Sequence, residues 1–194
     1  MNILFIGNSY TYYNNMPEEL FLPIAEAEGL SVQVTAVTKG GYYLSQFADP
    51  ENEEGKRLRG TVRGRRYDVV VLQDQSCDPI RDEERFLGGV RDLKALLGGQ
   101  TKRFVLYATW GRKTGSPQLE ELNMTTTEMT EALSAAYRKA GELYGMDVAE
   151  VGRAFVAYAK AHPDAELYDP DQSHPSIIGS AVAAETILRT ILGR

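Results

Sequence analysis

Apolar stretches of strand length alternate along this chain with longer stretches in which apolar residues repeat every three or four positions. The first stretch, residues 1–6, runs into Gly7 and then into small polar residues, which is typical of a buried parallel strand and its following turn. Further strands are expected at residues 32–36, 67–72, 104–108 and 146–151.

Helical spacing of apolar residues fills the segments between these strands. One helix is expected over residues 16–27, kinked or shortened by Pro23 and ended by Gly29. Others are expected at residues 86–97, 122–143, 154–161 and 177–191. Residues 49–66 are rich in both charges and predict a solvated loop with a short helix. The alternation predicts an α/β fold, a three-layer α/β/α sandwich around a five-stranded parallel sheet, with residues 1–194 as one domain.

The amino-acid composition limits which classes of binding partner and which cellular locations are expected. A net charge of −6 and a pI near 5.1 argue against binding to nucleic acid or to an anionic membrane, because both attract a basic surface. A single cysteine, Cys77, excludes an internal disulfide, and it is expected to be a small buried hydrophobe. No apolar run approaches the roughly 20 residues that span a bilayer. The expectation is a cytoplasmic protein if Met1 is the native start, and a secreted or periplasmic one if a leader has been removed.

Two stretches near opposite ends of the chain carry the elements of nucleophilic chemistry. Ser9 follows the first strand, at the sheet edge where open α/β proteins bind ligands. His174 can act as its base, and Asp171, three residues earlier, can reach the other ring nitrogen through one tight turn. Asp169 is the competing carboxylate, and a serine in the position of Ser9, taken alone, is more often a helix N-cap than a nucleophile. His162 lies before a proline in a polar stretch and is expected to be solvated.

These stretches resemble the conserved blocks of a known enzyme family, the GDSL/SGNH hydrolases. Residues 7–11 (GNSYT) are similar to the family's first block, with Asn8 where the family often has aspartate, and residues 171–175 (DQSHP) are similar to its last block. Gly41 and Gln75 fall where the glycine of the second block and the asparagine of the third block lie.

The resemblance implies a flavodoxin-like α/β/α fold and the hydrolysis of esters. It assigns Ser9 as nucleophile, His174 as general base and Asp171 as the carboxylate that orients the base. It also assigns the oxyanion hole to the N–H groups of Ser9 and Gly41 and to the side-chain amide of Gln75. Glutamine is one methylene longer than the asparagine of the family, which changes the geometry of the oxyanion hole. Gln73 is therefore an alternative donor.

Aromatic residues gather on the turns around the predicted site. Tyr10, Tyr42 and Trp110, together with Asn8, are expected to contact a substrate, and an aromatic rim would suit a sugar or aryl group. Tyrosines at a boundary between loop and core are also common without such a role. No metal-ligand spacing and no glycine-rich phosphate loop is apparent, so no cofactor is expected.

These observations favour a serine esterase acting on a small ester through a Ser-His-Asp acyl-enzyme mechanism, and the expected substrate is an O-acetyl group on a carbohydrate. The alternative is a non-catalytic carbohydrate-binding module on the same fold. A third hypothesis is a flavodoxin-like cofactor binder.

Overall fold

The computed structural model describes residues 1–101 and 103–194 and contains one central parallel sheet. Its strands are β1 (Asn2–Gly7), β2 (Gln33–Thr38), β3 (Val69–Leu72), β4 (Phe104–Tyr107) and β5 (Asp147–Ala149). The strand order is β2-β1-β3-β4-β5 and each neighbouring pair is parallel. This is the flavodoxin-like order, in which β2 is added on one side of β1 and the later strands on the other. In sheets of this kind a ligand crevice lies at the carboxyl ends of β1 and β3, where the strand order reverses.

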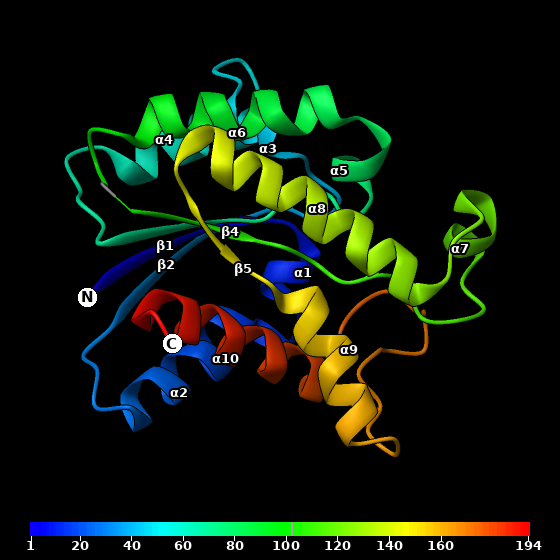
Figure 1. Ribbon diagram of the computed structural model, residues 1–194. Helices are drawn as coiled ribbons and strands as arrows, with labels where there is room; N and C mark the ends of the chain where they lie inside the picture. The colour runs from blue at the N-terminus through cyan, green and yellow to red at the C-terminus, as the bar shows by residue number, and fades with distance from the viewer. Residues whose placement is uncertain (102) are drawn as a thin grey trace.

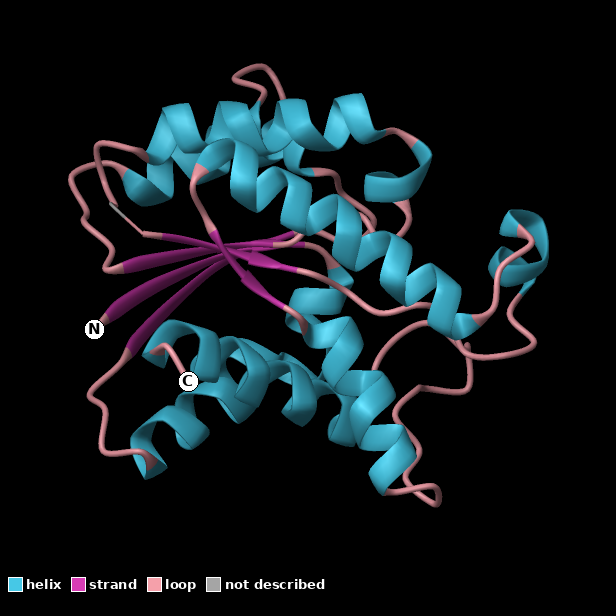
Figure 2. Cartoon of the chain, in the orientation of Figure 1, coloured by secondary structure: helices cyan, strands magenta, loops and turns pink. Residues whose placement is uncertain are grey.

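Helices cover both faces of the sheet, which confirms the predicted three-layer α/β/α sandwich (Figures 1 and 2). The helical segments are α1 (Ser9–Tyr12), η1 (Tyr13–Asn15), η2 (Met16–Phe21), α2 (Leu22–Ala27), α3 (Leu44–Ala48), α4 (Glu53–Val62), α5 (Asp78–Arg81), α6 (Glu83–Leu97), α7 (Pro117–Leu122), α8 (Thr126–Tyr144), α9 (Val151–Ala161) and α10 (Ile177–Leu192). Helices α3, α4, α6 and α8 pack on one face, and η2, α2, α9 and α10 pack on the other.

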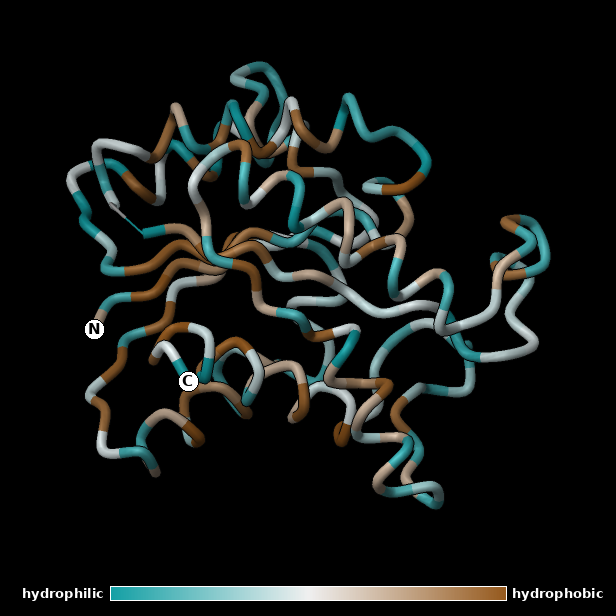
Figure 3. The backbone as a smooth tube through the Cα atoms, in the orientation of Figure 1, coloured by the Kyte–Doolittle hydropathy of each residue, from teal (hydrophilic) through white to brown (hydrophobic). Residues whose placement is uncertain are grey.

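The three central strands, β1, β3 and β4, have continuous apolar runs because both of their faces are buried, whereas the edge strands β2 and β5 include polar residues. Successive side chains of a strand point to opposite faces, so Ile3 and Phe5 join the core beneath α10, whereas Leu4 and Ile6 join the core beneath α6. Figure 3 shows this hydrophobic band along the sheet. A buried strand thus ends at Gly7, and the polar residues after it are held at the rim of the core.

The kink predicted at Pro23 is present. The first part of the segment, η2, is a π-helix in which Leu22 N–H donates to Pro17 O, and α2 begins beside Pro23. Proline has no N–H to give to a carbonyl one turn earlier, so the regular helix restarts there. Asn14 and Asn15 precede η2 in the left-handed region, with φ of 54° and 50°.

Several element ends differ from the predicted ones. The helix predicted over residues 122–143 is two helices, because Asn123 adopts a left-handed conformation and Thr125 then caps α8 together with Glu128. The fifth strand ends early because Val151 already begins α9. Within residues 49–66, Asn52 caps α4, as expected of a short helix there.

The last helix returns the end of the chain to its first strand. Ile187 and Leu188 of α10 lie in the same core cluster as Ile3 and Phe5 of β1. The segment that joins α9 to α10 therefore passes the carboxyl end of β1 (Figure 1). Within the described chain, none of the helices combines the length and the apolar character needed to cross a bilayer.

Candidate active site

The turn after β1 is built from a capped helix start and a buried glutamine. Ser9 is the first residue of α1, and the Asn8 side chain caps this helix by accepting the Tyr10 N–H at 3.1 Å. Beneath the turn, Gln73 Oε1 accepts hydrogen bonds from Asn8 N–H at 2.9 Å and from the Thr11 hydroxyl at 2.8 Å. The N-cap role is therefore filled by Asn8, and the Ser9 hydroxyl is left for other chemistry.

The structure brings Ser9 together with the histidine and aspartate from the far end of the chain. His174 Nε2 lies 2.8 Å from Ser9 Oγ, and His174 Nδ1 lies 2.5 Å from Asp171 Oδ2. Asp171 Oδ1 also accepts the N–H groups of Ser173 and His174 at 3.0 and 2.9 Å. Its rival, Asp169, accepts no bond from the imidazole: its N–H donates to the His174 carbonyl at 2.8 Å.

The electrostatics of this chain of contacts suit a base. Partial burial raises the pKa of Asp171, but the hydrogen bonds from His174 and Ser173 outweigh that effect and hold the pKa below its usual range. An ionised carboxylate accepts a hydrogen bond from His174 Nδ1–H and so keeps the proton on Nδ1. The lone pair of His174 Nε2 then faces the Ser9 hydroxyl, which is the tautomer a general base requires.

The turn that follows Ser9 also holds the histidine in place. The Tyr13 ring stacks on the His174 imidazole with 4.5 Å between ring centroids. Asn14 Nδ2 donates to the Pro175 carbonyl at 2.9 Å, directly after the histidine. Sequence reasoning missed Asn14. Its signal was a pair of adjacent asparagines, the residue type that most readily adopts the left-handed backbone seen here.

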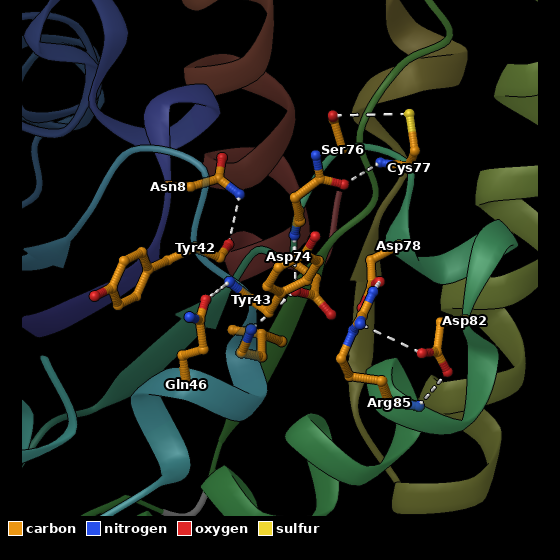
Figure 4. Close-up of polar contacts among 12 residues, drawn as sticks. Asn8, Tyr42, Tyr43, Gln46, Asp74, Ser76, Cys77, Asp78, Asp82 and Arg85 are labelled. Atoms are coloured by element: carbon orange, nitrogen blue, oxygen red, sulfur yellow. Dashed lines mark hydrogen bonds and ion pairs between the residues drawn. The ribbon is translucent and has the colours of Figure 1, made fainter. Parts of the chain in front are cut away.

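Two segments that carry the predicted oxyanion donors converge beside this turn (Figure 4). Gly41 is exposed in a tight turn with φ of 72°, a conformation that favours glycine. The carbonyl of the next residue, Tyr42, accepts a hydrogen bond from Asn8 Nδ2 at 3.0 Å. This bond joins the loop to the turn at residues 7–11, called the nucleophile turn below because it carries the predicted nucleophile, Ser9. Gln75 lies on the other segment, just past β3.

The two glutamines after β3 are not equivalent. Gln73 is fully buried, and its amide is used on both sides, since Nε2 donates to the Asp74 carbonyl while Oε1 serves Asn8 and Thr11. Gln75 is partly exposed, and its Oε1 accepts the Cys77 N–H at 2.8 Å. Among the described residues we find no hydrogen-bond partner for Gln75 Nε2. Of the two amides, that of Gln75 is the one free to serve a substrate.

Two of the expected substrate contacts are wrong. Trp110 is fully buried, stacked between Tyr10 and Phe155 at centroid distances of 4.6 and 4.1 Å, and its Nε1–H donates to the Ser173 carbonyl at 3.1 Å. The side chain turns from the end of β4 into the core beneath α9, so it supports the histidine loop instead of a substrate. Tyr10 is 3% exposed, and its hydroxyl contacts Ser173 Oγ at 3.0 Å.

Asn8 is a third correction, because it is buried and both ends of its amide are taken by backbone groups of Tyr10 and Tyr42. Tyr42 is partly exposed, and its contact with a substrate stays a prediction. Cys77 is buried, as expected. Among residues 1–101 and 103–194, no group of three or more His, Cys, Asp or Glu side chains is arranged to hold a metal ion.

Gly7 offers a test of how closely the nucleophile turn is packed. A Cβ at this position would lie 2.3 Å from Thr11 Oγ1 and 2.7 Å from Gln73 Oε1. We expect Gly7→Ala to displace Gln73, to lower the free energy of unfolding by about 1–3 kcal/mol and to lower kcat for ester hydrolysis by about tenfold or more. Thermal unfolding and steady-state kinetics measure the two effects.

The matched control is Gly60→Ala in α4, where a Cβ meets no atom within 4 Å. This control should leave kcat unchanged and should not destabilise the protein, because alanine favours a helix more than glycine does. Wild-type stability in Gly7→Ala would contradict the packing described here.

Comparison with known proteins gives matches only among solved structures: no family model and no curated protein matches the chain. A protein from Slackia heliotrinireducens, described as a candidate SGNH hydrolase, superposes with a TM-score of 0.85 at 29% identity over 98% of both chains. A DUF4886 family protein from Bacteroides uniformis gives a TM-score of 0.82 at 18% identity, over 100% of this chain and 83% of that one. An acetylxylan esterase from Geobacillus stearothermophilus gives 0.69 at 17% identity, over 98% and 93%.

Proposed function

We propose that this chain, which belongs to the SGNH/GDSL hydrolase family, is a serine esterase that cleaves a small ester through a covalent acyl-enzyme. One observation carries the proposal: Ser9 Oγ, His174 Nε2 and Nδ1, and Asp171 Oδ2 form a continuous chain of contacts at 2.8 and 2.5 Å. A nucleophile in contact with a base, itself oriented by a third group, is the arrangement that activates a hydroxyl.

The proposed reaction begins when His174 Nε2 takes the proton of Ser9 as Oγ bonds to the carbonyl carbon of the ester. The negative charge that develops on the carbonyl oxygen is stabilised by the N–H groups of Ser9 and Gly41 and by the Gln75 amide. His174 then gives its proton to the leaving alcohol as the carbon–oxygen bond breaks. A water molecule, deprotonated by His174, releases the acid and restores Ser9.

The substrate we propose is an O-acetyl group on a carbohydrate. One structural neighbour, the Geobacillus stearothermophilus enzyme matched in its natural form and as three variants, is named as an esterase of acetylated xylan or xylooligosaccharides, at 15–17% identity. Tyr12, one of the exposed large side chains, lies beside the turn of Gly40, since a Cβ on that glycine would be 2.9 Å from the Tyr12 hydroxyl. Tyr12 thus places an aromatic ring beside the Gly41 loop, on which a sugar can rest.

The function is tested by covalent labelling with a fluorophosphonate. We expect stoichiometric loss of fluoride and one adduct, found by peptide mass spectrometry on Ser9, because only an activated hydroxyl attacks the phosphorus. His174→Ala is the matched control and should be labelled at least about a hundredfold more slowly, since the base is missing. A carbohydrate-binding module without turnover would not be labelled, and that result would favour the alternative.

Substrate class is tested in parallel with acetylated xylooligosaccharides and with p-nitrophenyl esters of short and long acyl chains. We expect acetyl esters to have the highest kcat/KM. Faster cleavage of long-chain esters would reject the acetyl group while leaving the serine mechanism intact.

A further inference from the structure

A buried carboxylate lies directly behind the proposed oxyanion hole. Asp74 follows the end of β3 and is fully buried. Its Oδ1 accepts two backbone hydrogen bonds, from Leu44 N–H at 2.8 Å and from Gln75 N–H at 2.7 Å (Figure 4). Its own N–H donates to the Tyr137 hydroxyl at 3.1 Å. Within the described chain, its Oδ2 has no hydrogen-bond partner.

The two N–H groups that meet on this one oxygen belong to different segments of the site. Leu44 begins α3 and ends the short loop that carries Gly41, whereas Gln75 carries the free amide. The Asp74 carbonyl in turn accepts the amide of Gln73, which supports the nucleophile turn. Three segments that are distant in sequence are therefore joined at one residue.

We infer that Asp74 is a positioning residue of the oxyanion hole: its carboxylate sets the Gly41 loop and Gln75 at the separation that lets both donate to one oxygen. This inference rests on the proposed function, because an oxyanion hole has a role only if the chain cleaves esters. A residue that served packing alone would not need a carboxylate here, since burying one without a partner for Oδ2 is costly.

The charge of Asp74 depends on pH in the neutral range. Burial raises its pKa to about 7, and the N–H groups of Leu44 and Gln75 oppose that rise. Of the charged groups nearby, Asp78 raises the pKa further and Arg85, which is paired with Asp78, lowers it. Since this pKa lies above that of a free aspartate, the carboxylate loses its charge as the pH falls through about 7. The two hydrogen bonds to it thus weaken as the pH falls through about 7.

The first test is Asp74→Asn, which preserves the shape and one acceptor oxygen but removes the charge. At pH 8 we expect kcat to fall by about 10–100-fold with KM within about threefold, because an oxyanion hole acts on the transition state. The profile of kcat/KM against pH should contain one ionisation fewer than that of the wild type. A kcat within twofold of the wild type, or a loss of stability with kcat unaltered, would overturn the inference.

Asp82→Asn is the matched control. Asp82 contacts Arg85 in the same cluster of charges but makes no contact with Asp74, and asparagine keeps its role as N-cap of α6. This variant should keep the wild-type kcat and pH profile.

A second measurement applies to the wild-type protein and does not depend on catalysis. In NMR spectra, the amide resonances of Leu44 and Gln75 should titrate together with a midpoint near 7, in the wild type and in His174→Ala alike. Separate midpoints, or no titration, would overturn the positioning role of Asp74 even if Asp74→Asn fails to fold. If Ser9→Ala keeps its activity, the proposed function fails, and this titration still decides whether Asp74 joins the two segments.

Discussion

Replacing Ser9 with alanine is expected to lower kcat for p-nitrophenyl acetate by about 10⁴-fold or more. Alanine leaves no oxygen to attack the carbonyl, and water would have to react without a covalent intermediate. The Ser9 hydroxyl bonds to the His174 ring at a partly exposed site, so its loss should move the melting temperature by no more than about 2 °C. Steady-state kinetics and thermal unfolding provide the two measurements.

Ser31→Ala is the control for this variant, because Ser31 is exposed at the opposite end of the sheet, before β2. It should retain wild-type kcat and KM. Wild-type turnover in Ser9→Ala would show that the proposed serine mechanism is wrong, whereas the description of the fold would still hold.

The second large effect is expected from Asp171→Asn. An asparagine can still accept the backbone N–H groups of Ser173 and His174, so the turn should survive. The NH₂ group that would then face His174 Nδ1 can only donate a hydrogen bond, so the imidazole is driven to the tautomer that carries hydrogen on Nε2. That nitrogen then cannot deprotonate Ser9, and we expect kcat to fall by about 10³–10⁴-fold with little change in KM.

Asp169→Asn tests the competing assignment with the same change of chemistry two residues away. Its backbone contacts the histidine carbonyl, but the imidazole bonds to Asp171. The control should therefore lose no more than about threefold in kcat. A larger loss in Asp169→Asn than in Asp171→Asn would reassign the orienting carboxylate.

The layered fold followed from local features of the sequence, whereas the pairing of Ser9 with His174 rested on their residue types and on the family resemblance. Uninterrupted apolar strands require burial on both faces, and parallel strands end at the same edge, so the position of Ser9 at the carboxyl edge of the sheet could be predicted. The spacing of Asp171 and His174 suits one tight turn, and the structure contains that turn. The flavodoxin-like strand order came from the family resemblance and is confirmed.

The failures share one cause, since position at a strand end does not tell which way a side chain points. Trp110 was expected at the rim, but its ring fills the space between Tyr10 and Phe155. Gln73 was offered as an oxyanion donor, but it is buried beneath the turn. Asp74 was not predicted as a site residue, because in the sequence it cannot be distinguished from a solvated aspartate after a strand. Its contacts in the folded chain, above all with Leu44, distinguish it. Such contacts are fixed by tertiary packing.

The order in which the catalytic groups occur along the polypeptide has a consequence during biosynthesis. The sheet is complete once β5 has been made, whereas His174 and α10, the helix that follows its loop, are synthesised later. A nascent chain that has already assembled its strands would hold a serine without a base and remain inert. Onset of ester cleavage would thus follow the synthesis of α10, and a stop codon ahead of position 171 would give a product without hydrolytic activity.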